Sequence, residues 1–187
     1  MKLPYFSRTA GKRGDLTKLR REGHIPAVLY GKDTPSPQSI YVQKEEIAKF
    51  LRQIKQGMLA TTLFELHDGQ KSYLALIKEV QYHRSTYAIE HLDFILVNDK
   101  HPITVNVPIQ IMGAADCVGV KLGGFVRQPI RSLKVSCFLK DLPQEFAIDV
   151  RDMQIAQSKR LADIVIPAGV KPKAKMNEVA VVIAKKA

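Results

Sequence analysis

The spacing of apolar residues in the first half of the chain predicts a mixture of helices and strands. Four apolar side chains recur at i, i+3, i+4 and i+7, the spacing of one helical face, and they are Ile47, Phe50, Leu51 and Ile54. We therefore expect a helix over residues 45–54. Apolar runs and alternation bounded by turn residues predict strands over residues 25–30, 39–42, 61–66, 71–83 and 88–97. Residues 34–37 are expected to form a rigid loop, and residues 67–70 the turn of a hairpin.

A further short helix is expected over residues 16–22. Leu16 and Leu19 lie three residues apart on one helical face and would anchor the helix, whereas Arg20 projects from a different face. Asp15 suits the N-cap position, and Gly23 suits a left-handed C-terminal cap.

Strict alternation continues in the second half and predicts an all-β domain, in which no helix is strongly predicted. One half-buried strand has apolar residues at every second position, at Ile103, Val105, Val107, Ile109 and Ile111, and its Pro108 suggests a sheet edge. Further strands are expected over residues 133–139, 146–150 and 179–183. Residues 98–102 interrupt the strand pattern, so we expect two domains, residues 1–97 and 98–187.

Positive charge is concentrated at the start of the chain. Through residue 21 a single acid, Asp15, stands against seven cations, which are Lys2, Arg8, Lys12, Arg13, Lys18, Arg20 and Arg21. This basic segment carries more than half of the net charge of +11. Lys and Arg that neutralise phosphates release condensed counterions, so the segment indicates a polyanion partner, with RNA as the leading candidate. The alternative is a solvated basic tail.

Polar side chains gather on two neighbouring predicted strands. In the last strand of the first half, His91 and Asp93 share the face opposite to the apolar positions. In the preceding strand, alternation places Gln81 and His83 on one face and Lys78 on the other. A hairpin would bring the two polar sets together, where they suit RNA bases and ribose hydroxyls. The alternatives are an ordinary solvated face, a His–Asp pair that orders the sheet, or an acid–base or metal cluster.

Several other classes of protein lack support in the sequence. No secretory signal or membrane-spanning apolar run is apparent, and no phosphate-binding glycine motif occurs. Cys117 and Cys137 have neither Cys-x-x-Cys nor zinc-finger spacing, so a zinc site is short of ligands. Reduced core cysteines are favoured over a disulfide. We therefore expect a cytoplasmic protein with no metal, no cofactor, no small-molecule substrate and no membrane partner.

Three separated motifs resemble a known family. They are KLRREGHIPAVLYG at residues 18–31, KEVQYH at 78–83 and HLDF at 91–94, and they are similar to the bacterial large-subunit ribosomal protein that binds 5S rRNA, number twenty-five of its series. The second half, with GVKLGG at 119–124 and Leu142-Pro143, resembles the β-rich extension of the long form, the CTC general stress protein type. The resemblance spans nearly the whole chain and is stronger before residue 98.

The resemblance implies a mainly β protein with a few α-helices, in which a small N-terminal β-barrel with helices precedes an all-β C-terminal domain. It implies a non-catalytic structural constituent of the large ribosomal subunit, seated on the loop E region of 5S rRNA and near other large-subunit components. The implied RNA contacts are Arg8, Arg13, Lys18, Arg20, Tyr30, Lys78, Gln81, His83, His91 and Asp93.

Two alternatives to this function remain open at the level of sequence. One is a barrel that recognises tRNA, as in the anticodon-binding domain of a glutamine-type tRNA synthetase, although no catalytic domain is attached. The other is a nucleic-acid hydrolase that uses His83, His91 and Asp93. In the second half, Lys171, Lys173 and Lys175 form a basic patch that is either solvated or in contact with RNA.

Overall fold

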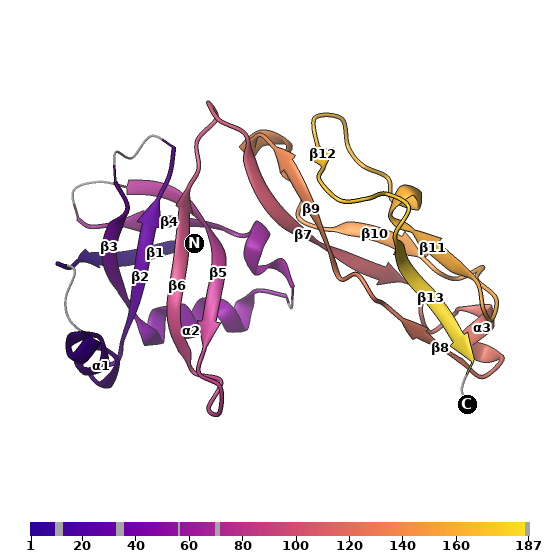
Figure 1. Ribbon diagram of the computed structural model, residues 1–187, viewed down its shortest axis with the longest axis horizontal. Coiled ribbons are helices and arrows are strands. Elements are labelled where there is room, and N and C mark those ends of the chain that lie inside the picture. The colour runs from indigo at the N-terminus through magenta and orange to yellow at the C-terminus, as the bar shows by residue number, and fades with distance from the viewer. Residues whose placement is uncertain (10–12, 33–35, 56, 70–71, 186–187) are drawn as a thin grey trace. The chain divides into compact units, whose positions relative to one another are not determined.

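The computed structural model describes residues 1–9, 13–32, 36–55, 57–69 and 72–185, and of Arg13 only the backbone. The chain divides into two compact units, Met1–His101 and Pro102–Ala187, and β-strands are the predominant regular structure in each (Figure 1). Lys12 and residues 33–35, which include part of the expected rigid loop, lie outside the described residues. Within the described ranges, no helix is long and apolar enough to span a bilayer.

Unit 1 is a closed six-stranded barrel with the strand order β1-β3-β2-β6-β5-β4 (Figure 1). Its strands are β1 (Lys2–Ser7), β2 (His24–Tyr30), β3 (Gln38–Gln43), β4 (Leu63–His67), β5 (Ser72–Tyr82) and β6 (Ile89–Leu96). β1 closes the barrel because it pairs antiparallel with β3 and parallel with β4. The sequence pattern did not predict β1, since only Leu3 and Tyr5 alternate there and Pro4 interrupts them.

Alternating side chains fill the barrel. In β6, Leu92 and Phe94 are fully buried, as their shared parity predicts, whereas Leu96 of the same parity is half-buried; Leu29 of β2 is also fully buried. Helix α2 (Lys44–Gln53) confirms the expected helix and packs Phe50 edge-on against Phe64, with ring centroids 6.2 Å apart. A 3-10 turn, η1 (Met58–Thr61), precedes β4. Each large apolar side chain buried in this way contributes about 1.5–3 kcal/mol.

The basic helix α1 (Arg13–Arg21) begins earlier than the leucine spacing predicts. Asp15 therefore lies in the first turn and is not the N-cap. In the first turn its carboxylate still complements the positive end of the helix dipole. The predicted C-terminal cap is confirmed, because Gly23 has φ of +84° and its N–H donates to the carbonyl of Arg20 at 3.2 Å. Leu16 and Leu19 are half-buried and line a hollow of about 210 Å³ together with Arg8, Thr9 and Asp15.

Unit 2 contains two sheets around one core. The four-stranded sheet has the order β10-β7-β9-β12, with bounds β7 (Ile103–Met112), β9 (Ser132–Cys137), β10 (Phe146–Asp149) and β12 (Lys171–Pro172). The three-stranded sheet has the order β11-β13-β8, with bounds β8 (Gly124–Arg127), β11 (Ser158–Arg160) and β13 (Val179–Lys185). Short helical turns are α3 (Val118–Lys121), η2 (Leu139–Asp141) and η3 (Leu161–Asp163).

Two details of unit 2 differ from the sequence pattern. Strand β9 ends at Cys137, so Leu139 lies in the turn η2 and not in the strand. β7 is an inner strand and not an edge, but Pro108 precedes the first position paired with β10, so only β9 is paired there.

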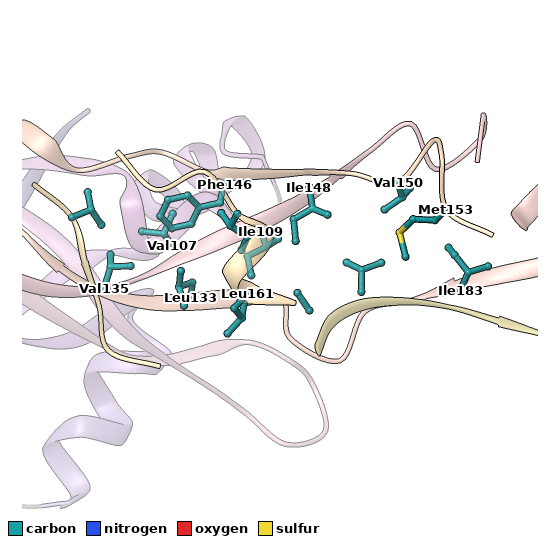
Figure 2. Packing of buried hydrophobic residues seen from close by; sticks show 14 of the residues in the cluster. Val107, Ile109, Leu133, Val135, Phe146, Ile148, Val150, Met153, Leu161 and Ile183 are labelled. Atoms are coloured by element: carbon teal, nitrogen blue, oxygen red, sulfur yellow. The ribbon is translucent and has the colours of Figure 1, made fainter. Parts of the chain in front are cut away.

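Buried residues from both sheets form the core of unit 2. Figure 2 shows Leu133, Phe146 and Ile148 within one cluster, to which Ile183 of the other sheet also belongs. Cys117 and Cys137 are free and buried in this core, as expected for reduced cysteines. The Cys117 thiol donates to the carbonyl of Met153 at 3.3 Å.

Candidate nucleic-acid interface

The polar residues predicted on one face lie on the outside of the barrel, where β2, β6 and β5 are neighbours. The pairing register places Gln81 of β5 directly opposite His91 of β6, and Glu79 opposite Asp93. Asp93 also neighbours Val28 of β2. Since Leu92 and Phe94 point into the barrel, His91 and Asp93 point outward, as alternation predicts. We call Tyr30, Lys78, Gln81, His91 and Asp93 the polar face.

His91 and Asp93 form a close pair on this face. Nδ1 of His91 lies 2.8 Å from Oδ1 of Asp93, and the two side chains are 20% and 26% exposed. Nδ1 itself is shielded from solvent and makes no hydrogen bond of regular geometry, so the contact is electrostatic and acts when the imidazole is protonated. The accessible part of His91 is therefore the rest of its ring.

Lys78 lies on the polar face, contrary to the strict alternation of the sequence pattern. The register of β5 against β6 shifts between Ile77 and Glu79, which is a β-bulge with Lys78 as the extra residue. The Lys78 ammonium lies over the ring of Tyr30, 5.6 Å from its centroid. This cation–π contact keeps an exposed cation next to Tyr30 on the outer surface of the barrel.

Two arginines of the basic segment bind the barrel through their Nε atoms. Arg20 of α1 donates to the carbonyl of Glu90 at 3.2 Å, and Arg8 donates to the carbonyl of Ile40 at 3.1 Å. A guanidinium has five N–H donors, so one bond to the barrel leaves others for a ligand. The Arg20 bond joins residues 70 apart in sequence and links α1 to the backbone just before His91 in β6.

The remaining predicted residues lie around this region. Lys18 is exposed on α1, and the side chain of Arg13 is outside the described residues. His83 follows β5 in the hairpin turn, where its Nδ1 accepts hydrogen bonds from the backbone N–H groups of Ser85 and Thr86 at 3.3 and 3.2 Å. His83 thus organises the turn, and its Nε2 is the nitrogen that remains for a ligand.

Sequence reasoning missed three features of the outer surface. Glu79 adds a second carboxylate opposite Asp93. Phe6 and Tyr41 stack with ring centroids 5.2 Å apart, and His24 tilts against Tyr41 at 4.9 Å. The outward parity of Tyr41 and His24 follows from their strands, but Phe6 could be placed only once β1 was known.

No arrangement in the described part of the chain resembles a catalytic or metal centre. No group of three or more His, Cys, Asp or Glu side chains in these ranges is placed to hold a metal ion. Nδ1 of His83 is engaged by its own turn, and no described contact links His83 to the His91–Asp93 pair. The face is instead suited to binding through cations, amides and ring nitrogens.

Comparison with known proteins covers both units. The family model of the Ribosomal L25p family matches residues 3–94, and that of the Ribosomal protein TL5, C-terminal domain, matches residues 102–187. The chain is 40% identical over 186 residues to the "Large ribosomal subunit protein bL25" of Chlamydia trachomatis serovar L2, with both chains fully covered. The proteins of the same name from Chlamydia abortus and Chlamydia pneumoniae are each 39% identical over 186 residues, again with full coverage. The chain therefore belongs to the L25p family of ribosomal proteins, a family without enzymatic activity, in the form that carries a TL5-type C-terminal domain.

Proposed function

We propose that this protein, which its family identifies as a structural protein of the large ribosomal subunit, binds the loop E region of 5S rRNA. In this proposal residues 1–97 form the 5S rRNA-binding domain, and residues 98–187 contact other components of the subunit. The protein then acts in the cytoplasm, on the ribosome, without a cofactor. The contacts to RNA are those implied by the family resemblance, from Arg8 and Arg13 to His91 and Asp93.

The observation that carries the proposal is the hydrogen bond from Arg20 to the carbonyl of Glu90. The sequence contains two separate indications of RNA binding, the basic segment and the polar face. The Arg20 bond holds α1 against the strand that carries His91 and Asp93, so one RNA groove can contact both. Cations then position the protein on phosphates, while the polar face reads base and ribose groups.

The carboxylate of Asp93 distinguishes recognition of RNA bases and riboses from simple attraction between cations and phosphates. A carboxylate cannot pair with a phosphate, so in an RNA interface it acts as an acceptor from base amino or imino groups, ribose hydroxyls or a protonated His91. Lys78 above Tyr30 and Gln81 beside His91 supply donors on either side. The face therefore offers both donors and acceptors, which recognition of bases requires.

The first test of the proposal is competition between 5S rRNA and tRNA for the full chain across a salt series. We expect 5S rRNA to displace tRNA, with a preference that survives at salt concentrations where non-specific binding is lost. Equal affinity for both RNAs at every salt concentration would remove the 5S assignment.

Two substitutions distinguish contacts to phosphates, which position the protein, from contacts to bases and riboses, which give specificity. Arg20→Ala should weaken binding and reduce the slope of log affinity against log salt by up to about 0.9, because it removes at most one phosphate contact. Arg52→Ala, an exposed cation of α2, is the matched control and should leave the slope unchanged. Asp93→Ala should reduce discrimination between 5S rRNA and unrelated RNA by about tenfold or more, with little change in slope. If Asp93→Ala tightens binding to every RNA equally, the carboxylate only repels RNA and the reading role is wrong.

A further inference from the structure

We propose that the outer face of the four-stranded sheet in unit 2 is a second RNA-binding surface, which contacts the phosphate–ribose backbone. We call it the lysine face and define it by Lys134, Lys171, Lys173, Thr104, Asn106 and Ser136. The choice of RNA as the ligand rests on the proposed ribosomal function, whereas the surface itself is argued from unit 2 alone.

The pairing register brings these residues into two rows across the sheet. In one row, Thr104 of β7 pairs with Ser136 of β9, which pairs with Lys171 of β12. In the other, Asn106 of β7 pairs with Lys134 of β9, whose carbonyl accepts a hydrogen bond from the backbone N–H of Lys173 at 2.8 Å. Lysines that are 37 or more residues apart in sequence are thus neighbours in the sheet.

These side chains point away from the core. Leu133, Val135 and Cys137 of β9 are buried at 0%, 0% and 1% exposure, so the alternate residue Lys134 points outward. The ammonium of Lys173 lies 3.3 Å from the hydroxyl of Thr104, two strands away, which places it across the outer face. Lys134, Lys171 and Lys173 are all exposed.

The lysine face carries positive charge without balancing acids. None of its defining positions is Asp or Glu, and within the described ranges none of its three lysines forms an ion pair. Asp149 belongs to the same sheet, but it pairs with Met112 at the far end of β7 and is bound by Arg151. Asp141 lies close to Gly169, two residues before Lys171, but the three lysines outnumber it, so this face attracts a polyanion.

The need to prevent pairing at the sheet edge does not explain all three lysines of the lysine face. Lysine and proline on a short edge strand prevent pairing with other chains, and Lys171 and Pro172 of β12 fit that role. Lys134, however, lies in β9, which is an inner strand between β7 and β12. Its exposed cation has no edge to protect.

The chemistry of the face favours an RNA backbone over an acidic protein. Ammonium, hydroxyl and amide groups are the donors that proteins use toward phosphate and sugar. A protein partner would require large apolar anchors at the centre of the interface, whereas the centre of this face is polar and its neighbouring aromatic side chain, Phe138, lies beyond the end of β9. Phe138, which directly follows β9 and is 44% exposed, offers an aromatic surface for an unpaired base.

The test begins with lysine footprinting of the full chain by acetylation and mass spectrometry. An RNA duplex of mixed sequence should protect Lys134, Lys171 and Lys173, while Lys121 and Lys185, exposed lysines of the other elements of unit 2, should remain reactive. The same acetylation experiment with 5S rRNA measures protection of Lys18 and Lys78, which tests the proposed interface on the barrel. Failure of the lysine face and failure of the proposed 5S rRNA function are therefore distinguishable.

A matched pair of double variants then measures the contribution of the face. Lys134→Gln with Lys171→Gln should lower the slope of log affinity against log salt by about 1.4 to 1.8, because each lost phosphate contact accounts for about 0.7–0.9. The control, Lys121→Gln with Lys185→Gln, removes the same charge and should leave the slope unchanged. Equal slopes for both variants, or equal protection of all five lysines, would overturn the proposal. Protection by poly-glutamate as strong as that by RNA at equal charge concentration would also overturn it, in favour of an acidic protein.

Discussion

The two units have similar net charge but distribute it differently. Met1–His101 contains sixteen cations and eleven acids, and Pro102–Ala187 contains thirteen cations and seven acids, so the net charges are +5 and +6. In unit 1 the excess lies in the basic segment before β2, and the rest of the barrel is nearly balanced. In unit 2 the cations are scattered along the sequence apart from Lys171, Lys173 and Lys175, and strand pairing brings Lys134 next to this group. The net charge of a unit therefore does not show where its positive charge is concentrated, whereas the register of the strands does.

The sheets of the two units also differ in how they end. The barrel is closed and has no free strand edge, so its outer face and α1 are the surfaces that a ligand can use. The two sheets of unit 2 are open, and the edge of the larger one is a strand of two residues that ends in proline. A short edge strand limits unwanted pairing and leaves the flat face available for recognition.

The largest expected effect tests whether the two units are separate. Phe94→Ala empties the centre of the barrel and should destabilise unit 1 by about 3–5 kcal/mol, whereas Leu133→Ala should destabilise unit 2 by about 2–5 kcal/mol. Hydrogen exchange measured by mass spectrometry should show loss of protection only in the unit that carries the substitution. Loss of protection in both units from either variant would mean that the chain unfolds as one cooperative unit.

A smaller effect is expected at Gly119, where α3 packs against β13 in unit 2. A Cβ atom at this position would lie 2.9 Å from Cγ2 of Ile183 and 2.9 Å from the carbonyl carbon of Gln154. Gly119→Ala should therefore cost about 1–3 kcal/mol through overpacking. The thermal midpoint of unit 2 should fall while that of the barrel stays constant. A midpoint equal to that of the wild type would show that α3 moves without cost.

Gly14 in the first turn of α1 and Gly23 at its C-terminal cap should respond to substitution in opposite directions. Gly23→Ala places a side chain at a φ of +84° and should cost about 1–2 kcal/mol at the end of α1. Gly14→Ala meets no atom within 4 Å and should stabilise the same helix by about 0.5–1 kcal/mol. Urea denaturation of the barrel measures both effects. A loss of stability in Gly14→Ala would contradict the helical conformation at that position.

Much of the barrel surface could be predicted from sequence because alternation reports the direction of a side chain. The outward positions of Gln81, His91 and Asp93 follow directly from the buried positions of Leu92 and Phe94. Lys78 was placed on the wrong face because a β-bulge adds one residue and reverses the parity of everything before it. Nothing in the local pattern marks the bulge.

Pairing between distant strands is the part that sequence patterns do not contain. β1 was missed because two alternating residues are too few for a period, yet β1 closes the barrel. The barrel itself was expected only from the family resemblance. The neighbourhood of Lys134 and Lys173 depends on a strand of two residues, which is too short to show a period. The hydrogen bond from Arg20 to the carbonyl of Glu90 also cannot be predicted from local sequence patterns, because it links separate elements.

The smallest effect is expected at Asp149 and Arg151 of unit 2, the counterpart of the Asp93–His91 pair of unit 1. In unit 2, the side chain and the backbone N–H of Arg151 donate to Asp149 and lower the pKa of that carboxyl to about 2. The carboxylate form is therefore favoured by folding above the unfolded pKa of about 3.9, and this stability is lost as the pH falls toward 2. The side chain of Asp149 is 41% exposed and therefore screened by solvent, so the effect is expected in the titration and not in the thermal midpoint.

Arg151→Gln should raise the pKa of Asp149 part of the way to its ordinary value, because the backbone N–H at residue 151 still donates at 3.0 Å. Carbon-detected NMR titration of the carboxyl measures the pKa directly. Lys159→Gln is the matched control, since Lys159 contributes less to the shift than Arg151, and it should move the pKa less. An equal shift in the two variants would show that the general positive charge of unit 2, and not the Arg151 hydrogen bonds, holds this carboxylate ionised. In that case the carboxylate of Asp149 would be stabilised by the overall positive charge of unit 2. Asp93 of unit 1 would differ from it, because its Oδ1 lies 2.8 Å from Nδ1 of a single partner, His91.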